Sequence, residues 1–172
     1  MAPGNEKYDV VIIGGAMIGS AIAWFLISNE DFNGTICVIE KDLTFEFAST
    51  SRSNSCIRQQ YSNELNVQIS QYGAEFIRNF KKLIQDDSAP NIILQNFGYL
   101  YLSSSKDSEK VFMEDQAMQA GLGAGTRIMS PAEIKSDYPF YNVSDVVCGS
   151  HNTLNEGYFD GATVFNWWQK KN

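Results

Sequence analysis

Residues 8–19 read YDVVIIGGAMIG, and this stretch decides the fold. Its first half is rich in β-branched apolar residues and ends at a glycine, which is typical of a strand buried on both faces of a parallel sheet. Residues 14–19 have the layout of a G-x-G-x-x-G turn, with Ala16 at the second glycine position. Apolar residues then recur at spacings of four as far as about Ser28, so we expect a helix after the turn.

A second strand that ends in an acid completes the unit. Residues 35–40 read TICVIE, and Glu40 follows Gly19 at about the 20-residue spacing of dinucleotide-binding βαβ units. In such units the glycines allow a tight turn, close approach of a pyrophosphate and close packing of the helix, whose N-terminus binds the phosphate. The carboxylate of Glu40 would accept hydrogen bonds from the adenosine ribose and repel a 2′-phosphate. The alternative is a plain βαβ unit with a glycine turn.

Beyond this unit the chain has no internal repeat. We expect a long loop rich in serine and threonine over residues 45–61. Later elements are predicted from apolar periodicity, strand alternation and a Ser-Pro-Ala-Glu capping box. They are a helix over 64–84, a strand over 96–104, a helix over 107–120, a short helix opening at 130–133, a strand over 146–150 and a final helix from Asp160 or Gly161.

Composition excludes several classes of function. The 172 residues are 44% hydrophobic, enough for one packed domain or one domain plus part of another. A net charge of −7 disfavours binding to nucleic acid or anionic membranes. Three scattered cysteines and a single histidine argue against a metal site or a disulfide framework. The apolar run over 10–27 is broken by glycines, which argues against a membrane span, and the polar N-terminus lacks a signal peptide, so we expect a cytoplasmic protein.

Five stretches resemble a known family. They are YDVVIIGGAMIGSAIAWFL at 8–26, VIEKD at 38–42, ASTSRSNSCIRQQY at 48–61, MSPAEIKSDYPF at 129–140 and NEGYFDGATVFNWW at 155–168. Together they resemble the N-terminal portion of the FAD-dependent D-amino-acid oxidase / sarcosine oxidase family, which includes glycine oxidase-like enzymes. The loop with its AST and IRQQY segments is more specific than the glycine motif, which NAD enzymes share.

The resemblance implies an α/β fold: a Rossmann-like FAD-binding βαβ sheet with part of an α+β substrate domain. The implied domains are an FAD-binding part at 1–90, a partial substrate domain at 91–155 and a helix returning to the FAD domain at 156–172. Members are roughly twice this length or more, consistent with a two-domain enzyme, so we expect a truncated N-terminal portion with exposed apolar faces and an open sheet edge.

The implied activity is oxidation of the C–N bond of an amino acid or N-methyl amino acid, as in the sarcosine and dimethylglycine branch. Its implied partners are FAD, a small-molecule amine, and oxygen or another protein as electron acceptor.

The expected cofactor-binding residues come from the turn, the end of the second strand and the serine-rich loop. They are Gly14, Gly15, Ala16, Met17, Ile18, Gly19, Glu40, Lys41, Ser49, Thr50 and Ser51, and no metal ligand is expected. The resemblance places the three hydroxyl residues along the flavin and the pyrophosphate.

Arg58 is the candidate catalytic residue, because its guanidinium could bind a substrate carboxylate through two parallel hydrogen bonds. A surface or interdomain salt bridge is the alternative for Arg58, and Arg52 is a weaker candidate for the same role. The sarcosine oxidases have a second arginine three residues earlier, where this chain has Ser55. His151 is expected to be structural and Cys56 inert.

Two other functions stay open. A copy of this fold could be a non-catalytic fragment or an assembly protein. The βαβ unit alone also permits an NAD-binding domain of a dehydrogenase, although the long loop over 45–61 disfavours it, because NAD domains usually proceed quickly to the next βα unit.

Overall fold

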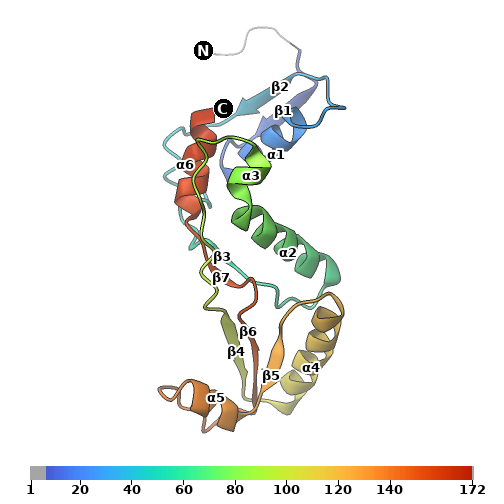
Figure 1. Cartoon of the computed structure of the whole chain (residues 1–172), viewed down its shortest axis with the longest axis vertical. Helices are drawn as coiled ribbons and strands as arrows, with labels where there is room; N and C mark the ends of the chain where they lie inside the picture. Colours follow the sequence, from blue (N-terminus) through green and yellow to red (C-terminus); the bar gives the residue numbers. More distant parts are fainter. Residues whose placement is uncertain (1–6, 172) are drawn as a thin grey trace. The chain divides into compact units, whose positions relative to one another are not determined.

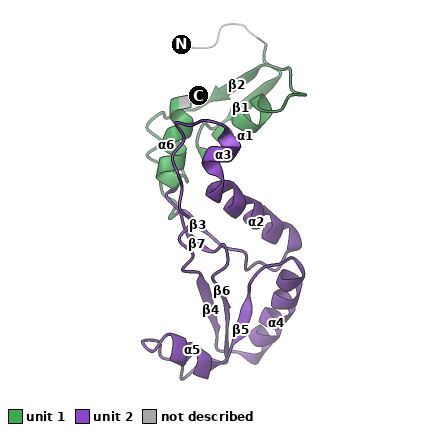
Figure 2. Ribbon diagram, viewed as in Figure 1, with its two compact units in different colours: residues 1–54, 161–172 green, residues 55–160 purple. Residues whose placement is uncertain are grey.

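The computed structural model describes residues 7–171 and divides the chain into two compact units (Figure 2). Unit 1 consists of residues 1–54 and 161–172, and unit 2 consists of residues 55–160. Residues 1–6, part of the segment on which the expectation of a cytoplasmic protein rests, lie outside the described residues. The domain limits expected from the sequence stay a prediction.

Unit 1 is built on the predicted strand–helix–strand unit (Figure 1). Strands β1 (Val10–Ile13) and β2 (Ile36–Ile39) pair in parallel along their whole length. Helix α1 (Met17–Ile27) connects them and contacts both strands as well as α6 (Gly161–Lys171), the last helix of the chain. The βαβ unit and the final helix are thus confirmed.

The expectation that β1 is buried on both faces is wrong. Ile13 is 89% exposed and Val11 is 51% exposed. Ile18 of α1 is also 77% exposed. The sheet of unit 1 has only two strands within residues 7–171, so both strands are edges and no other layer covers these side chains. The exposed apolar faces expected from the sequence are therefore present.

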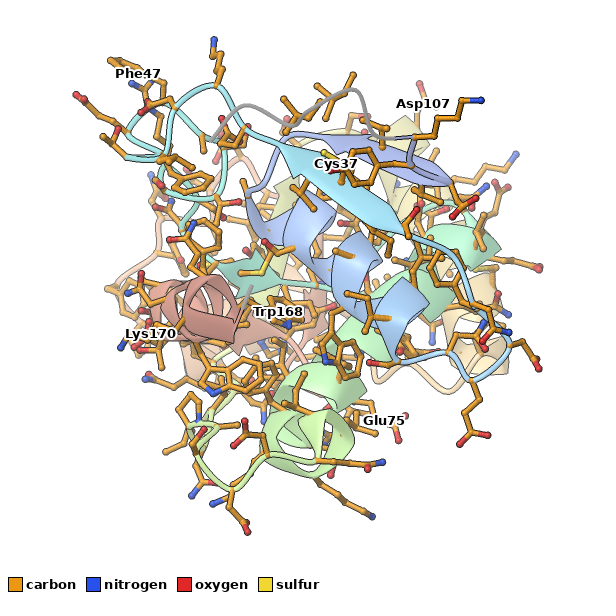
Figure 3. All side chains as sticks on the ribbon, turned by 90° about the horizontal axis from the view of Figure 1, so that it is seen from above. Cys37, Phe47, Glu75, Asp107, Trp168 and Lys170 are labelled. Carbon is orange, nitrogen blue, oxygen red and sulfur yellow. The ribbon has the colours of Figure 1, made fainter. Side chains whose placement is uncertain are left out.

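The core of unit 1 lies where α1, α6 and the loop after β2 meet. Phe45 is buried and packs edge to face against Phe165 of α6, with ring centroids 5.1 Å apart. Trp168 is only 3% exposed, whereas Phe47 lies at the outer edge of its loop and is 67% exposed (Figure 3). Trp168 therefore belongs to the core of unit 1.

Unit 2 contains a three-stranded antiparallel sheet in the order β4-β6-β5, with α4 contacting all three strands and α5 contacting β5 and β6 (Figure 1). A second small sheet pairs β3 with β7 in antiparallel fashion. The elements are β3 (Cys56–Ile57), α2 (Glu64–Arg78), α3 (Phe80–Ile84), β4 (Tyr99–Ser103), α4 (Lys106–Gly121), β5 (Arg127–Met129), α5 (Pro131–Asp137), β6 (Cys148–Asn152) and β7 (Gly157–Tyr158).

Local sequence signals account for the helices of unit 2. The predicted capping box opens α5, with Ser130 and Glu133 bonded reciprocally. The single helix expected over 64–84 is instead two helices, because Asn79 has φ −104° and ψ 17°. Its side-chain amide donates to the carbonyl of Glu75 at 3.0 Å, which closes the end of α2.

Three short strands were not predicted from the sequence. β5 has three residues, and β3 and β7 have two each, too few to show an alternating pattern. Each exists only through pairing with a partner distant in sequence. β3 therefore interrupts the loop expected over residues 45–61.

Within residues 7–171 no helix has both the length and the apolar character needed to cross a bilayer.

Candidate functional site

The turn between β1 and α1 is joined to the end of β2 through Glu40. Gly14 has φ 101°, a left-handed conformation that glycine adopts without strain. The N–H of Gly15 donates to Oε2 of Glu40 at 2.8 Å, and the N–H of Asp42 donates to Oε1 at 3.0 Å. These backbone donors, that of Asp42 first, hold the pKa of Glu40 below its ordinary value. The carboxylate is therefore ionised at pH 7 and suited to accept further hydrogen bonds.

The start of α1 is shaped for close approach of a ligand. Gly19 packs so tightly that a Cβ atom there would lie 1.8 Å from the carbonyl oxygen of Gly14. Ala16 is the N-cap residue and its side chain makes no capping hydrogen bond. Instead, the N–H of Met17 donates to Oγ1 of Thr50 at 3.2 Å. A hydroxyl from the serine-rich loop thus lies at the helix N-terminus.

These residues fit the ADP portion of FAD. The first turn of α1 contains no acidic residue, and the positive end of its dipole favours an anion such as a pyrophosphate. Glu40, at the end of the adjacent strand, uses one hydrogen bond on each oxygen for the backbone and retains lone pairs for ribose hydroxyls. Gly14, Gly15, Ala16, Met17, Gly19, Glu40 and Thr50 are brought together, whereas Ile18, Lys41, Ser49 and Ser51 are exposed in the same unit.

Arg58 belongs to unit 2 and lies between two tyrosines. Its guanidinium carbon is 4.7 Å from the ring centroid of Tyr61 and 5.7 Å from that of Tyr101. Its Nε atom is buried and has no hydrogen-bond partner, and within residues 7–171 no carboxylate forms a salt bridge with it. Burial lowers the pKa of Arg58, but the Tyr101 and Tyr61 side chains outweigh this effect and the pKa lies above its ordinary value. Arg58 is thus a cation held between two rings, with no carboxylate at salt-bridge distance among the described residues.

A cavity of about 190 Å³ adjoins Arg58, lined also by Gln60, Ser62, Tyr101 and Ser150 and by Phe112, Asp115 and Gln119 of α4. Burial raises the pKa of Tyr101, so its hydroxyl stays protonated at neutral pH. A larger hollow of about 560 Å³ lies around α3, and its lining includes Lys81, Lys82, Asp86 and Asp87. The smaller cavity is the candidate site because it is lined by a guanidinium that forms no salt bridge within residues 7–171.

Glu156 is a part of this region that the sequence analysis missed. Its side chain is fully buried and accepts four hydrogen bonds. Burial raises the pKa of Glu156 above its ordinary value, although the donors from Gln59, Gln60 and Asn152 act in the opposite direction. The only sequence signal was its place in the stretch NEGYFD, because nothing local indicates that the carboxylate meets Gln59, which lies 97 residues away.

Arg52 and His151, the other residues considered from the sequence, contact neighbouring side chains. Arg52 lies over the exposed ring of Phe47 at 4.9 Å. His151 lies on β6, with Nε2 2.9 Å from the hydroxyl of Tyr138 and Nδ1 3.4 Å from Nε of Arg127. Within the described residues, no group of three or more His, Cys, Asp or Glu side chains could hold a metal ion.

Acidification is expected to destabilise the chain through His151, its only histidine. Arg127 can only donate, so Nδ1 must accept and the ring must be neutral. Burial first, and then Arg127, lower the pKa of His151 in the folded state. Stability present at pH 7 is therefore lost as the pH falls below about 6.5, where the unfolded chain takes up the proton first.

The measurement is thermal unfolding at pH values of about 7.5 and 5.5, followed by the near-ultraviolet circular dichroism of the tyrosines. His151→Gln is the control, because the amide can accept from Arg127 and donate to Tyr138 without titrating. The melting temperature of the original chain should fall more on acidification than that of the variant. Equal pH dependences would contradict this role of His151.

Comparisons with known proteins identify the family. Residues 9–171 match the family described as FAD dependent oxidoreductase (DAO). The chain is 34% identical over 171 residues to FAD-dependent oxidoreductase domain-containing protein 1 of Xenopus laevis, covering 96% of this chain and 34% of that protein. It is 36% identical over 159 residues to the Bos taurus protein, covering 90% of this chain and 32% of that protein. The chain thus spans about a third of the length of these curated relatives.

Solved structures show the same fold. The L-proline dehydrogenase from P. horikoshii has a TM-score of 0.75 and 27% identity, covering 96% of this chain and 41% of that chain. The glycine oxidase from Bacillus cereus has a TM-score of 0.67 at 16% identity, covering 95% of this chain and 43% of that chain, a likeness of fold alone. The sequence resemblance and the α/β fold class are confirmed, and the chain belongs to the FAD-dependent oxidoreductase (DAO) family, whose cofactor is FAD.

Proposed function

We propose that this chain binds the ADP portion of FAD at the β1–α1 turn and serves the oxidation of the C–N bond of an amino acid or N-methyl amino acid. The observation that carries the substrate class is Arg58, a partly buried guanidinium beside a cavity with no carboxylate paired to it. A family relative named L-proline dehydrogenase, at 27% identity, supports an amine that also bears a carboxylate.

Each residue has a separate task in this proposal. The N-terminus of α1 binds the pyrophosphate through its N–H groups and dipole, and Glu40 accepts hydrogen bonds from the ribose. Thr50 contributes a hydroxyl near the helix start. Arg58 binds the substrate carboxylate with two parallel hydrogen bonds and so orients the amine. FAD, when bound, supplies the two-electron acceptor.

Arg58→Met should weaken the binding of carboxylate ligands by about 10- to 100-fold, because a hydrogen-bonded charge is lost. The probes are N-methylglycine and L-proline, titrated into the chain with binding followed by NMR, each compared with its methyl ester. The esters lack the carboxylate and should bind weakly to both proteins. Arg52→Met is the matched control and should bind the acids like the original chain.

The role of Arg58 is refuted if the acids bind Arg58→Met as well as they bind the original chain. The cofactor is tested separately by titration with FAD and with NADH, followed by quenching of ligand fluorescence. Binding of NADH in preference to FAD would contradict the flavin assignment and support the dehydrogenase alternative. The electron acceptor, oxygen or another protein, stays a prediction.

A further inference from the structure

Glu156 is the most completely buried carboxylate near Arg58, with 0% of its surface exposed. Oε1 accepts from the N–H of Gln59 at 2.6 Å, from the N–H of Gln60 at 3.1 Å and from Nδ2 of Asn152 at 3.0 Å. Oε2 accepts from Nε2 of Gln60 at 2.9 Å. A buried carboxylate with this many donors is a rigid anchor, because removal would leave several buried N–H groups unsatisfied.

The first of these donors bears directly on Arg58. The N–H of Gln59 belongs to the planar peptide group that begins at the carbonyl of Arg58. Fixing that N–H therefore fixes the backbone orientation from which the Arg58 side chain projects. Glu156 acts on Arg58 through the backbone and not as its counterion, because the two side chains form no salt bridge within residues 7–171.

The same network reaches the strand that supplies one of the two tyrosine rings. Nε2 of Gln60 also donates to the carbonyl of Tyr99 at 3.1 Å, and the hydroxyl of Ser150 donates to Oε1 of Gln60 at 2.7 Å. Tyr99 and Tyr101 are alternate residues of β4, and their rings stack with centroids 6.1 Å apart. Through Gln60, Glu156 thus joins the backbone at Arg58 to the strand that carries Tyr101.

We propose that Glu156 is a positioning residue of the carboxylate site: its buried side chain holds the peptide after Arg58, and Gln60 holds β4, so that the guanidinium stays between Tyr61 and Tyr101. The proposal rests on the proposed role of Arg58 in binding a carboxylate. The guanidinium forms no salt bridge within residues 7–171, while its backbone is anchored by the separate carboxyl group of Glu156. A mobile arginine would lose more conformational entropy on binding its ligand.

The test reads the position of Arg58 directly, by the Nε–Hε signal of this residue in ¹⁵N NMR spectra. Arg58→Lys assigns the signal by removing it. In the original chain the signal should be displaced by the two tyrosine rings, and the amide protons of Gln59 and Gln60 should exchange slowly with solvent. Rapid exchange of these two amides in the original chain would overturn the proposal without the use of any variant.

Glu156→Gln removes the charge but keeps the volume, and it sets an amide NH₂ against donors that the carboxylate accepted. The Arg58 signal should move towards the signals of exposed arginines, and the affinity for N-methylglycine should fall by about five-fold. Glu114→Gln, at an exposed position of α4, is the matched control and should change neither the Arg58 signal nor the affinity for N-methylglycine.

An unchanged Arg58 signal in folded Glu156→Gln overturns the inference, even if Arg58→Met abolishes binding of N-methylglycine. An unchanged affinity in Arg58→Met instead contradicts the proposed function and leaves the spectroscopic test of Glu156 intact. If Glu156→Gln does not fold, amide exchange at Gln59 and Gln60 in the original chain decides.

Discussion

Replacing Gly19 with alanine is expected to abolish FAD binding and to destabilise unit 1 by about 3 kcal/mol. The added Cβ would lie 1.8 Å from the carbonyl oxygen of Gly14 and 3.2 Å from Cγ2 of Ile12. The first atom belongs to the turn before α1 and the second to β1, so the helix must move away from the strand. The N–H groups that would bind the pyrophosphate move with it, and loss of this geometry costs both stability and affinity.

The tryptophans make this effect measurable. All three of them, Trp24, Trp167 and Trp168, lie on helices of unit 1, so their fluorescence during denaturant unfolding reports on that unit. FAD retained through gel filtration measures binding. Gly121→Ala is the control, because a Cβ at the end of α4 meets no atom within 4 Å, and it should leave both results unchanged. If Gly19→Ala retained FAD and unfolded at the same denaturant concentration as the original chain, the close packing of Gly19 against the turn would be contradicted.

The parts of the fold that were predictable are those that short segments determine. The β1–α1–β2 unit has a β-branched strand, a glycine turn and an apolar helix in succession, and α5 begins with its own capping box. β5 and β7 escaped prediction because two or three residues carry no periodicity and form strands only by pairing with β6 and β3. The local pattern also failed to predict burial. Ile13 lies in a run of apolar residues typical of a buried strand, but it is exposed, because burial of a strand depends on which strands and helices lie beside it.

The residues of the candidate site also differ in how far the sequence could predict them. Glu40 could be assigned from its spacing after the glycine turn, and its bond with the N–H of Gly15 agrees with that placement. Arg58 could be selected as a cation in a distinctive loop, but its stacking on Tyr101 depends on how β4 is placed. Glu156 gave no comparable signal, since a glutamate in a polar segment ordinarily lies at the surface. Its function becomes visible only when the donors that converge on it are known.

Gly157→Ala is expected to disrupt the anchoring of Glu156, with a loss of about 3 kcal/mol or more of stability in unit 2. Gly157 has φ 147°, and a Cβ there would lie 1.8 Å from the carbonyl oxygen of Gln95 and 3.2 Å from the backbone nitrogen of Phe97. Gln95 forms two backbone hydrogen bonds with Tyr158, of 2.8 and 3.2 Å. Alanine must separate these segments and displace the adjacent Glu156.

Unit 2 contains every tyrosine except Tyr8 and no tryptophan, so its unfolding is followed by tyrosine near-ultraviolet circular dichroism and by amide exchange in β4 and β6. The matched control is Gly123→Ala, at a glycine with φ 80° where an added Cβ would meet no atom within 4 Å. It isolates the cost of the backbone conformation, about 1–2 kcal/mol, from the cost of the clash. Gly157→Ala should therefore be the more destabilising of the two, and it alone should release the amides of Gln59 and Gln60 to exchange. Equal losses in the two variants, with those amides still protected, would show that Gly157 is needed only for its backbone conformation and that the close contact with Gln95 does not hold Glu156 in place.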